Sequence, residues 1–209
     1  MFRTITISRE YASGGGMIAR MIAERLGWNL LDARLVEDVA RRARVPTQAA
    51  ERLDEQTDPW FYPLVKGLWR GGFEAAPGSD VPWPLDAQTM AELAAEIMRE
   101  AARGGKSVVV GRGGQCVLRD REDVFHVSIF APLHQKMARL QERLGPGHDY
   151  EKILEEKDRQ RATYIKRFYG ENWKDRRLYH LTITSALGLE TVATTILSAA
   201  GSCVATPEK

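Results

Sequence analysis

The stretch ITISREYASGGGMIARMIAERLG, residues 5–27, constrains the fold of this chain more than any other segment. β-Branched residues predict a strand that ends at Ser8, and apolar residues at helical spacing predict a helix over 14–26. Between them lies a run of small residues, ASGGG, at 12–16. Glycines let backbone N–H groups converge, and the N-terminus of the following helix adds positive potential. The segment therefore predicts a phosphate-binding loop, and a tight turn that binds nothing is the alternative.

Strands and helices alternate along the rest of the chain, which predicts one α/β domain over 1–209. We expect further strands within 28–32, 106–114, 124–133 and 179–184, and helices over 35–45, 46–56, 87–104, 133–144, 150–168 and 188–200. Such a pattern predicts a parallel sheet with helices on both faces and right-handed crossovers. The loops after Ser8, Asp32, Gly111 and Phe130 then meet at the carboxyl ends of the strands, where ligands bind.

One internal region differs in composition. Residues 58–85 carry most of the tryptophans and most of the prolines of the chain. A long irregular segment in a compact domain is usually functional or interfacial. We therefore expect an insertion at about 46–85 and a homodimer that forms through 58–85.

Bulk composition narrows the class of protein. A net charge of +2 gives no reason to expect a nucleic-acid polymer or an anionic membrane as partner. No segment of the sequence has the length and hydrophobicity of a membrane span, and a strand-like FRTITIS follows Met1 in place of a leader. Cys116 and Cys203 give no metal-ligand spacing, so we expect reduced thiols and a cytoplasmic location.

Two candidate side chains stand at the predicted carboxyl edge of the sheet. Arg112, in GRGG at 111–114, ends a strand that we expect to be central. An arginine is costly to bury there unless it meets an anionic ligand or a carboxylate such as that of Asp32. Asp32 itself ends another strand on the same edge, either as a ligand contact or as the N-cap of the next helix.

The late helix is rich in cations and aromatic residues. Arg159, Arg161, Lys166 and Arg167 recur at spacings that let some of them share a face. A solvated helix surface explains such a run, and a lid that closes over a triphosphate explains it as well. His126, inside an apolar strand, is predicted to be a core residue.

Taken together, ITISREYASGGGMIARMIAERLGWNLLDARLVEDVA, VVVGRGG, DRQRATYIKRFYGENW and YHLTITSALGLE resemble the cytidylate kinase-like family, a branch of the P-loop nucleoside monophosphate kinases. The resemblance runs from residue 4 to about 197. It implies a three-layer α/β fold with a parallel five-stranded sheet of order 2-3-1-4-5. It also implies ATP and Mg²⁺ as phosphoryl donor and a pyrimidine nucleoside monophosphate, such as CMP or dCMP, as acceptor.

The resemblance assigns roles to individual residues. Those that it places around the donor phosphates are Ser13, Gly14, Gly15 and Gly16. Those that it places beside the acceptor are Asp32, Arg112 and Asp158, and those that it implies for catalysis are Arg112, Arg159 and Arg161. It also implies a lid over about 148–177, with Tyr164, Tyr169 and Trp173 in its aromatic stretch. No residue is assigned to a metal.

The loop departs from the family pattern in one respect. A standard P-loop has a lysine that reaches the β- and γ-phosphates and then a Ser or Thr that binds magnesium, but Gly15 and Gly16 most nearly occupy those places. The family usually has an arginine where this chain has Gly16. Compensating charge must therefore come from Arg9, Arg112, Arg159 or Arg161. Two hypotheses follow: a monophosphate kinase, or a catalytically inactive relative that binds a nucleotide or other anion as a sensor or partner-binding module.

Overall fold

A five-stranded parallel sheet forms the centre of the molecule, with strand order β2-β3-β1-β4-β5. The computed structural model describes residues 2–32 and 87–201. The strands are β1 (Thr4–Arg9), β2 (Asn29–Leu31), β3 (Ser107–Val110), β4 (Val124–Phe130) and β5 (Leu181–Thr184). The predicted order is confirmed. The expected helices at 35–45 and 46–56, the insertion at 46–85 and Cys203 lie outside the described residues.

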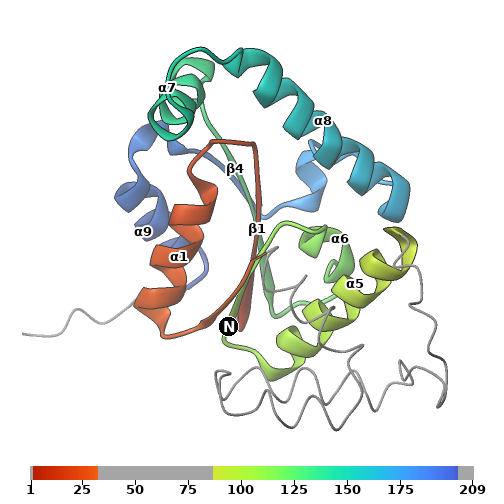
Figure 1. Ribbon diagram of the computed structural model, residues 1–209. Coiled ribbons are helices and arrows are strands. Elements are labelled where there is room, and N and C mark those ends of the chain that lie inside the picture. Colours follow the sequence, from red (N-terminus) through yellow and green to blue (C-terminus); the bar gives the residue numbers. More distant parts are fainter. Residues whose placement is uncertain (1, 33–86, 202–209) are drawn as a thin grey trace, which may run out of the picture.

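Helices cover both faces of this sheet, as Figure 1 shows. On one face α1 (Gly15–Leu26) packs beside α9 (Leu189–Ala199), and on the other α5 (Ala87–Gly104) packs beside α6 (Gly114–Val117). The predicted three-layer α/β architecture is therefore confirmed. The sequence analysis did not identify α6, because four residues next to two glycines give no helical periodicity.

The apolar side chains of the central strands form the core with the helices on one face of the sheet. Ile5 and Ile7 of β1 and Ile129 of β4 are at most 1% exposed. They pack in one cluster with Ile18 of α1 and Ile196 of α9. The alternating Thr4 and Thr6 of β1 are also buried, and their hydroxyls are satisfied by hydrogen bonds with Ser107 and His126.

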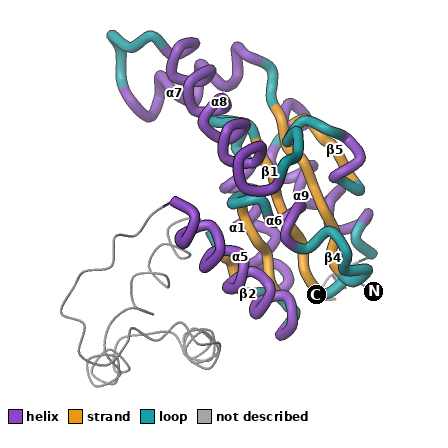
Figure 2. Tube along the Cα trace, turned by 90° about the vertical axis from the view of Figure 1, so that its right-hand side faces the viewer, coloured by secondary structure: helices purple, strands orange, loops and turns teal. Residues whose placement is uncertain are grey.

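Two helices, α7 (Leu133–Leu144) and α8 (Tyr150–Tyr169), cross over the carboxyl ends of the strands (Figures 1 and 2). The Asp149 side chain accepts a hydrogen bond from the backbone N–H of Lys152 at 3.0 Å and so caps the start of α8. Gly170 ends α8 in the left-handed conformation. Two short 3₁₀ turns, Arg176–Leu178 and Ser185–Leu187, flank β5.

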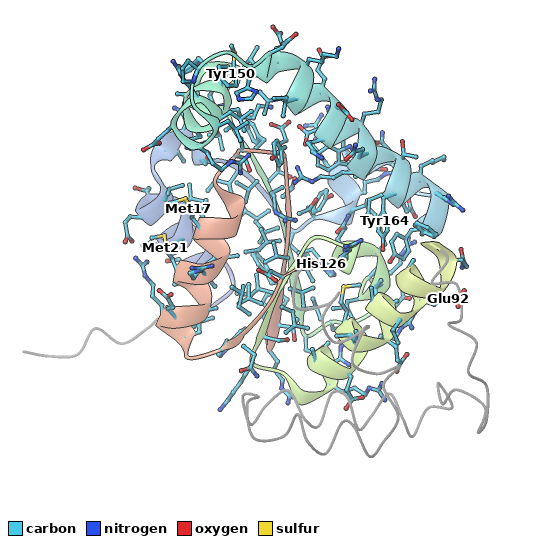
Figure 3. All side chains as sticks on the ribbon, in the orientation of Figure 1. Met17, Met21, Glu92, His126, Tyr150 and Tyr164 are labelled. Carbon is cyan, nitrogen blue, oxygen red and sulfur yellow. The ribbon has the colours of Figure 1, made fainter. Side chains whose placement is uncertain are left out.

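His126 lies within the sheet, near the centre of the molecule (Figure 3), and is 4% exposed. Its Nδ1 lies 2.7 Å from the Thr6 hydroxyl, and burial, followed by the nearby His180, lowers its pKa to about 4. The prediction that it is a core residue is confirmed. Within 2–32 and 87–201, no helix combines the length and the hydrophobicity that crossing a bilayer requires.

Candidate active site

The glycine-rich segment forms the predicted loop between β1 and α1. Gly14 has φ +82°, and its carbonyl accepts from the N–H groups of Met17 and Ile18 at 3.0 and 3.1 Å as the helix begins. Ser13 is fully buried, and its Oγ has no hydrogen-bond partner among the described residues. Buried hydroxyls normally form hydrogen bonds, so a hydroxyl without a partner is consistent with a loop that binds a polar ligand.

Arg9 connects this loop with the GRGG turn after β3. A Cβ at Gly15 would lie 2.7 Å from Cβ of Arg9, and one at Gly111 would collide with the Arg9 guanidinium. Both glycines therefore make room for one arginine. Gly15 most nearly occupies the position of the P-loop lysine. The Arg9 side chain therefore fills the space that a lysine side chain at position 15 would need.

The surroundings of Arg9 are strongly basic. Burial lowers the pKa of Arg9 to about 10, with further lowering by Arg161 and Arg112 and an opposing effect from Asp32. The structure thus brings three charged residues that the sequence analysis singled out within electrostatic reach of a fourth, Arg9. Cations gathered in a partly buried site are stabilised by an anionic ligand.

Arg112 lies in a turn of three consecutive residues with positive φ. Gly111, Arg112 and Gly113 have φ of +77°, +51° and +79°, a conformation that costs a non-glycine residue about 1 kcal/mol. The Tyr169 hydroxyl donates to the Arg112 carbonyl at 3.0 Å, and the Tyr169 ring fills the space where a side chain at Gly113 would lie. Strain of this kind at a site is typical of residues held for function.

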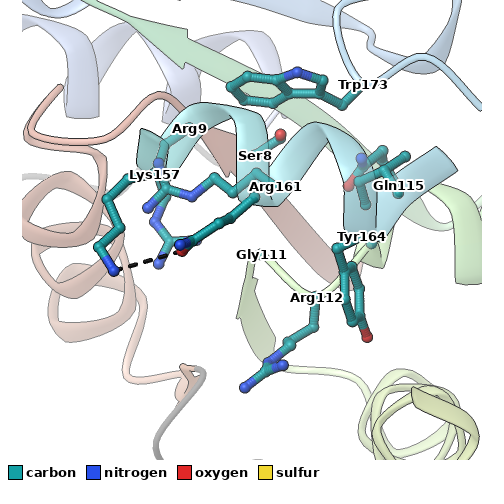
Figure 4. Close-up of a pocket in the computed structure, with 12 residues that line it drawn as sticks. Ser8, Arg9, Gly111, Arg112, Gln115, Lys157, Arg161, Tyr164 and Trp173 are labelled. Carbon is teal, nitrogen blue, oxygen red and sulfur yellow. Dashed lines mark hydrogen bonds between the residues drawn. The ribbon is translucent and has the colours of Figure 1, made fainter. Parts of the chain in front are cut away.

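A cavity of about 350 Å³ opens between these elements and α8 (Figure 4). Its cationic lining residues are Arg9, Arg112, Lys157 and Arg161, and none of the described residues that line it is a carboxylate. Trp173, Tyr164 and Ile165 supply aromatic and apolar wall. Such a lining suits a small organic anion.

A set of polar contacts holds α8 on the loop. Asp158 Oδ1 accepts from the Tyr11 backbone N–H at 2.7 Å and from Arg161 Nη1 at 2.9 Å. The guanidinium carbons of Arg143 and Arg161 lie 5.1 and 5.3 Å from the centroid of the Tyr11 ring. Asp158, which the resemblance places beside the acceptor, thus contacts the phosphate loop in this structure.

Cations from α7 also reach the loop, and the sequence analysis missed them. Arg139 Nη1 donates to the Ala12 carbonyl at 3.2 Å and to Ser185 Oγ at 3.4 Å, and Lys136 pairs with Glu10 at 2.8 Å. The spacing of Lys136, Arg139 and Arg143 on one helical face was a signal that could have identified them. Arg159, in contrast, is exposed on α8 and does not line the cavity.

The loop fits a phosphate better than it fits a metal ion. Its glycines, the orphaned Ser13 hydroxyl and the nearby guanidinium groups are donors that phosphate oxygens need. Gly16 offers no hydroxyl ligand, and the described ranges contain no group of three or more His, Cys, Asp or Glu side chains that could hold an ion. The residues present therefore supply little for Mg²⁺ beyond what bound phosphates would provide.

The glycine loop at the carboxyl edge of a 2-3-1-4-5 sheet defines the class as the P-loop kinase fold. The model of the cytidylate kinase-like family matches residues 4–187, and the chain belongs to this family. None of the curated proteins compared with the chain matches it.

Solved structures agree with this fold. The chain is similar to an uncharacterized protein from Eubacterium ventriosum, with TM-score 0.70 and 20% identity over 97% of this chain and 99% of that chain. A tunicamycin resistance protein from Deinococcus radiodurans gives TM-score 0.51 and 20% identity over 99% and 100%. A shikimate kinase from Bacteroides thetaiotaomicron gives TM-score 0.50 and 12% identity over 93% and 96%.

Proposed function

We propose that the protein transfers a phosphoryl group from Mg²⁺-ATP to a pyrimidine nucleoside monophosphate such as CMP or dCMP. The observation that carries this proposal is the cavity between the end of β1, the GRGG turn and α8, with four cations and no carboxylate among its described lining residues. Membership of the cytidylate kinase-like family supports the same reaction class. Positioning and charge stabilisation are what phosphoryl transfer chiefly requires.

Each part of the site has a role in this proposal. The backbone N–H groups around Ser13, Gly14, Gly15 and Gly16 would hold the donor phosphates at the start of α1. Arg112 and Asp32, at the carboxyl ends of their strands, would hold the acceptor. Magnesium, when bound, would neutralise charge on the donor phosphates. Arg161 would stabilise charge that develops during transfer, and Asp158 orients it through the 2.9 Å contact.

Arg9 would replace the missing lysine. Its stem packs on Gly15 and its guanidinium reaches the cavity, so it delivers a cation from the start of the loop instead of from its end. An arginine keeps its charge even where burial lowers its pKa to about 10. In this proposal position 15 must be glycine, because a Cβ there would lie 2.7 Å from the Cβ of Arg9.

The test is ADP production from Mg²⁺-ATP by the purified protein, with each common nucleoside monophosphate supplied in turn. We expect turnover with a pyrimidine monophosphate and a loss of about a hundredfold on changing Arg112→Ala. Arg119→Ala removes an arginine that is 53% exposed and pairs with Glu171, and it serves as the matched control. Adding a cation at Gly16, where nothing lies within 4 Å of a Cβ, tests whether the loop is short of charge.

The contrary result would favour the second hypothesis. The absence of ADP production with every acceptor, in protein that still binds ATP, would indicate a nucleotide or anion sensor that acts through a partner. The glycine-only loop is the observation that favours this alternative. If the Gly16→Arg variant also produces no ADP, the sensor hypothesis is strengthened.

We also propose that the protein forms a homodimer through 58–85, the segment rich in tryptophan and proline. Light scattering at micromolar concentration is expected to give twice the mass of the 23.5 kDa chain. A monomer under these conditions would contradict this proposal without affecting the reaction.

A further inference from the structure

Gln115 is an amide side chain that lines the cavity and is almost fully enclosed by the described residues. It lies on α6 and is 2% exposed. Among the described residues no hydrogen bond engages its side chain, whereas buried Thr6 is bonded to His126 and buried Thr4 to Ser107. The fully buried polar atoms that lack a partner in the described ranges are Ser13 Oγ, His126 Nε2 and Tyr164 Oη, so the Gln115 amide is reached from the cavity and is not sealed in the interior. This side chain is therefore placed to meet a ligand.

The position of Gln115 is fixed by its neighbours. Gly114 packs closely on β1 and β3, since an added Cβ would lie 3.2 Å from Val109 and 3.3 Å from Thr6. Cys116 is buried in a cluster with Ile165 and Trp173. The amide is thus held between two anchored residues, and little conformational freedom is lost when it binds.

The cavity has two chemically different sides. In Figure 4, Arg9, Lys157 and Arg161 gather on one side, and Gln115 lies on the other with Tyr164. Arg112 lies below them, with its guanidinium carbon 5.8 Å from the centroid of the Tyr164 ring. A ligand that satisfies both sides carries an anion at one end. At its other end it is flat or apolar and presents a hydrogen-bond donor beside an acceptor.

We propose that Gln115 is a specificity-determining residue that binds the base of the acceptor nucleotide, an inference that rests on the function proposed above. The carboxamide offers one donor and one acceptor side by side. Cytosine presents the complementary pair, with N3 accepting and the N4 amino group donating. The aromatic wall supplies stacking surface for the same ring. Gln115 thus makes the protein bind a nucleotide more tightly than a sugar phosphate that lacks the base.

The experiment measures binding of CMP and of ribose 5-phosphate by calorimetry in the full-length protein and in Gln115→Met. Methionine has nearly the same shape and no hydrogen bonds, so it preserves the packing of α6. Gln141→Met makes the same chemical change at an exposed position on α7 and is the matched control. Gln115→Glu, which keeps the size but only accepts hydrogen bonds, is the second variant.

We expect the wild type to bind CMP more tightly than ribose 5-phosphate, and Gln115→Met to reduce that ratio by about tenfold or more. Affinity for ribose 5-phosphate stays unchanged, which a general packing defect would not allow. A CMP preference that survives in both Gln115 variants overturns the inference, as does a wild type that binds the two ligands equally. The ADP assay reports separately on the proposed function, so a failure of base recognition and a failure of phosphoryl transfer are distinguishable.

Discussion

Two non-glycine residues in the loops after β1 and β3 have left-handed backbones, Ala12 with φ +57° and Arg112 with φ +51°. The side chain of Arg112 lines the cavity, so its strain accompanies a role. Ala12 offers only a carbonyl, which accepts from Arg139 at 3.2 Å. A glycine would present the same carbonyl without the penalty that Cβ imposes in this conformation.

Ala12→Gly is therefore expected to raise the free energy of unfolding by about 1 kcal/mol, measured by urea denaturation. Ala138→Gly, at an exposed position inside α7, is the control and is expected to lower it by about 1 kcal/mol. If both variants are destabilised alike, the left-handed backbone at Ala12 carries no strain.

Individual residues were predictable from the sequence to different degrees. Arg112 could be identified because a cation at the end of a buried strand demands an anion. The contact between Arg9, Gly15 and Gly111 could not be identified, since it joins residues about a hundred positions apart through backbone that only the fold brings together. Gln115 carried no periodic or charge signal at all.

At the scale of elements, a hydrogen bond joins α8 to the loop between β1 and α1. Asp158 accepts from the Tyr11 N–H at 2.7 Å, and Arg161 supports the same carboxylate oxygen. A hydrogen bond to an ionised group is worth about 1.5–3 kcal/mol. One carboxylate therefore joins α8 to the backbone of the loop after β1.

Asp158→Ala is expected to speed hydrogen exchange at the Tyr11 amide by about tenfold or more. The measurement is amide exchange in the ligand-free protein, read at Tyr11 and at core amides such as that of Ile7. Glu155→Ala, on the exposed side of α8, is the control and should leave Tyr11 unchanged. Equal protection of Tyr11 in Asp158→Ala and in the wild type would show that other contacts hold α8 in place.

Most helices and strands were predictable because their periodicity is strong and their ends are marked. The helix expected over 150–168 is observed over Tyr150–Tyr169, with its cap at Asp149. The four-residue α6 was missed, although it carries Gln115, because a helix that short depends on tertiary packing and not on propensity.

At the scale of the whole molecule, alternating strands and helices predicted a parallel sheet, and the resemblance to the cytidylate kinase-like family implied its order, 2-3-1-4-5. A parallel sheet brings the ends of β1, β2 and β3 to one edge, so Arg9, Asp32 and Arg112 meet there. The direction of the α7 cations toward the loop depends on how that helix packs, which no sequence pattern fixed.

The central claim is that Arg9 supplies the charge that a lysine supplies in other P-loops. The most direct measurement is steady-state ADP production by the wild type, Arg9→Ala, Gly15→Lys and the double variant. Arg9→Ala is expected to lose about a hundredfold in turnover. Gly15→Lys is expected to be impaired because its Cβ would lie 2.7 Å from that of Arg9. The double variant, in which the lysine has room, is expected to exceed Arg9→Ala by about tenfold. Full turnover in Arg9→Ala, or a double variant no faster than Arg9→Ala, would contradict the claim.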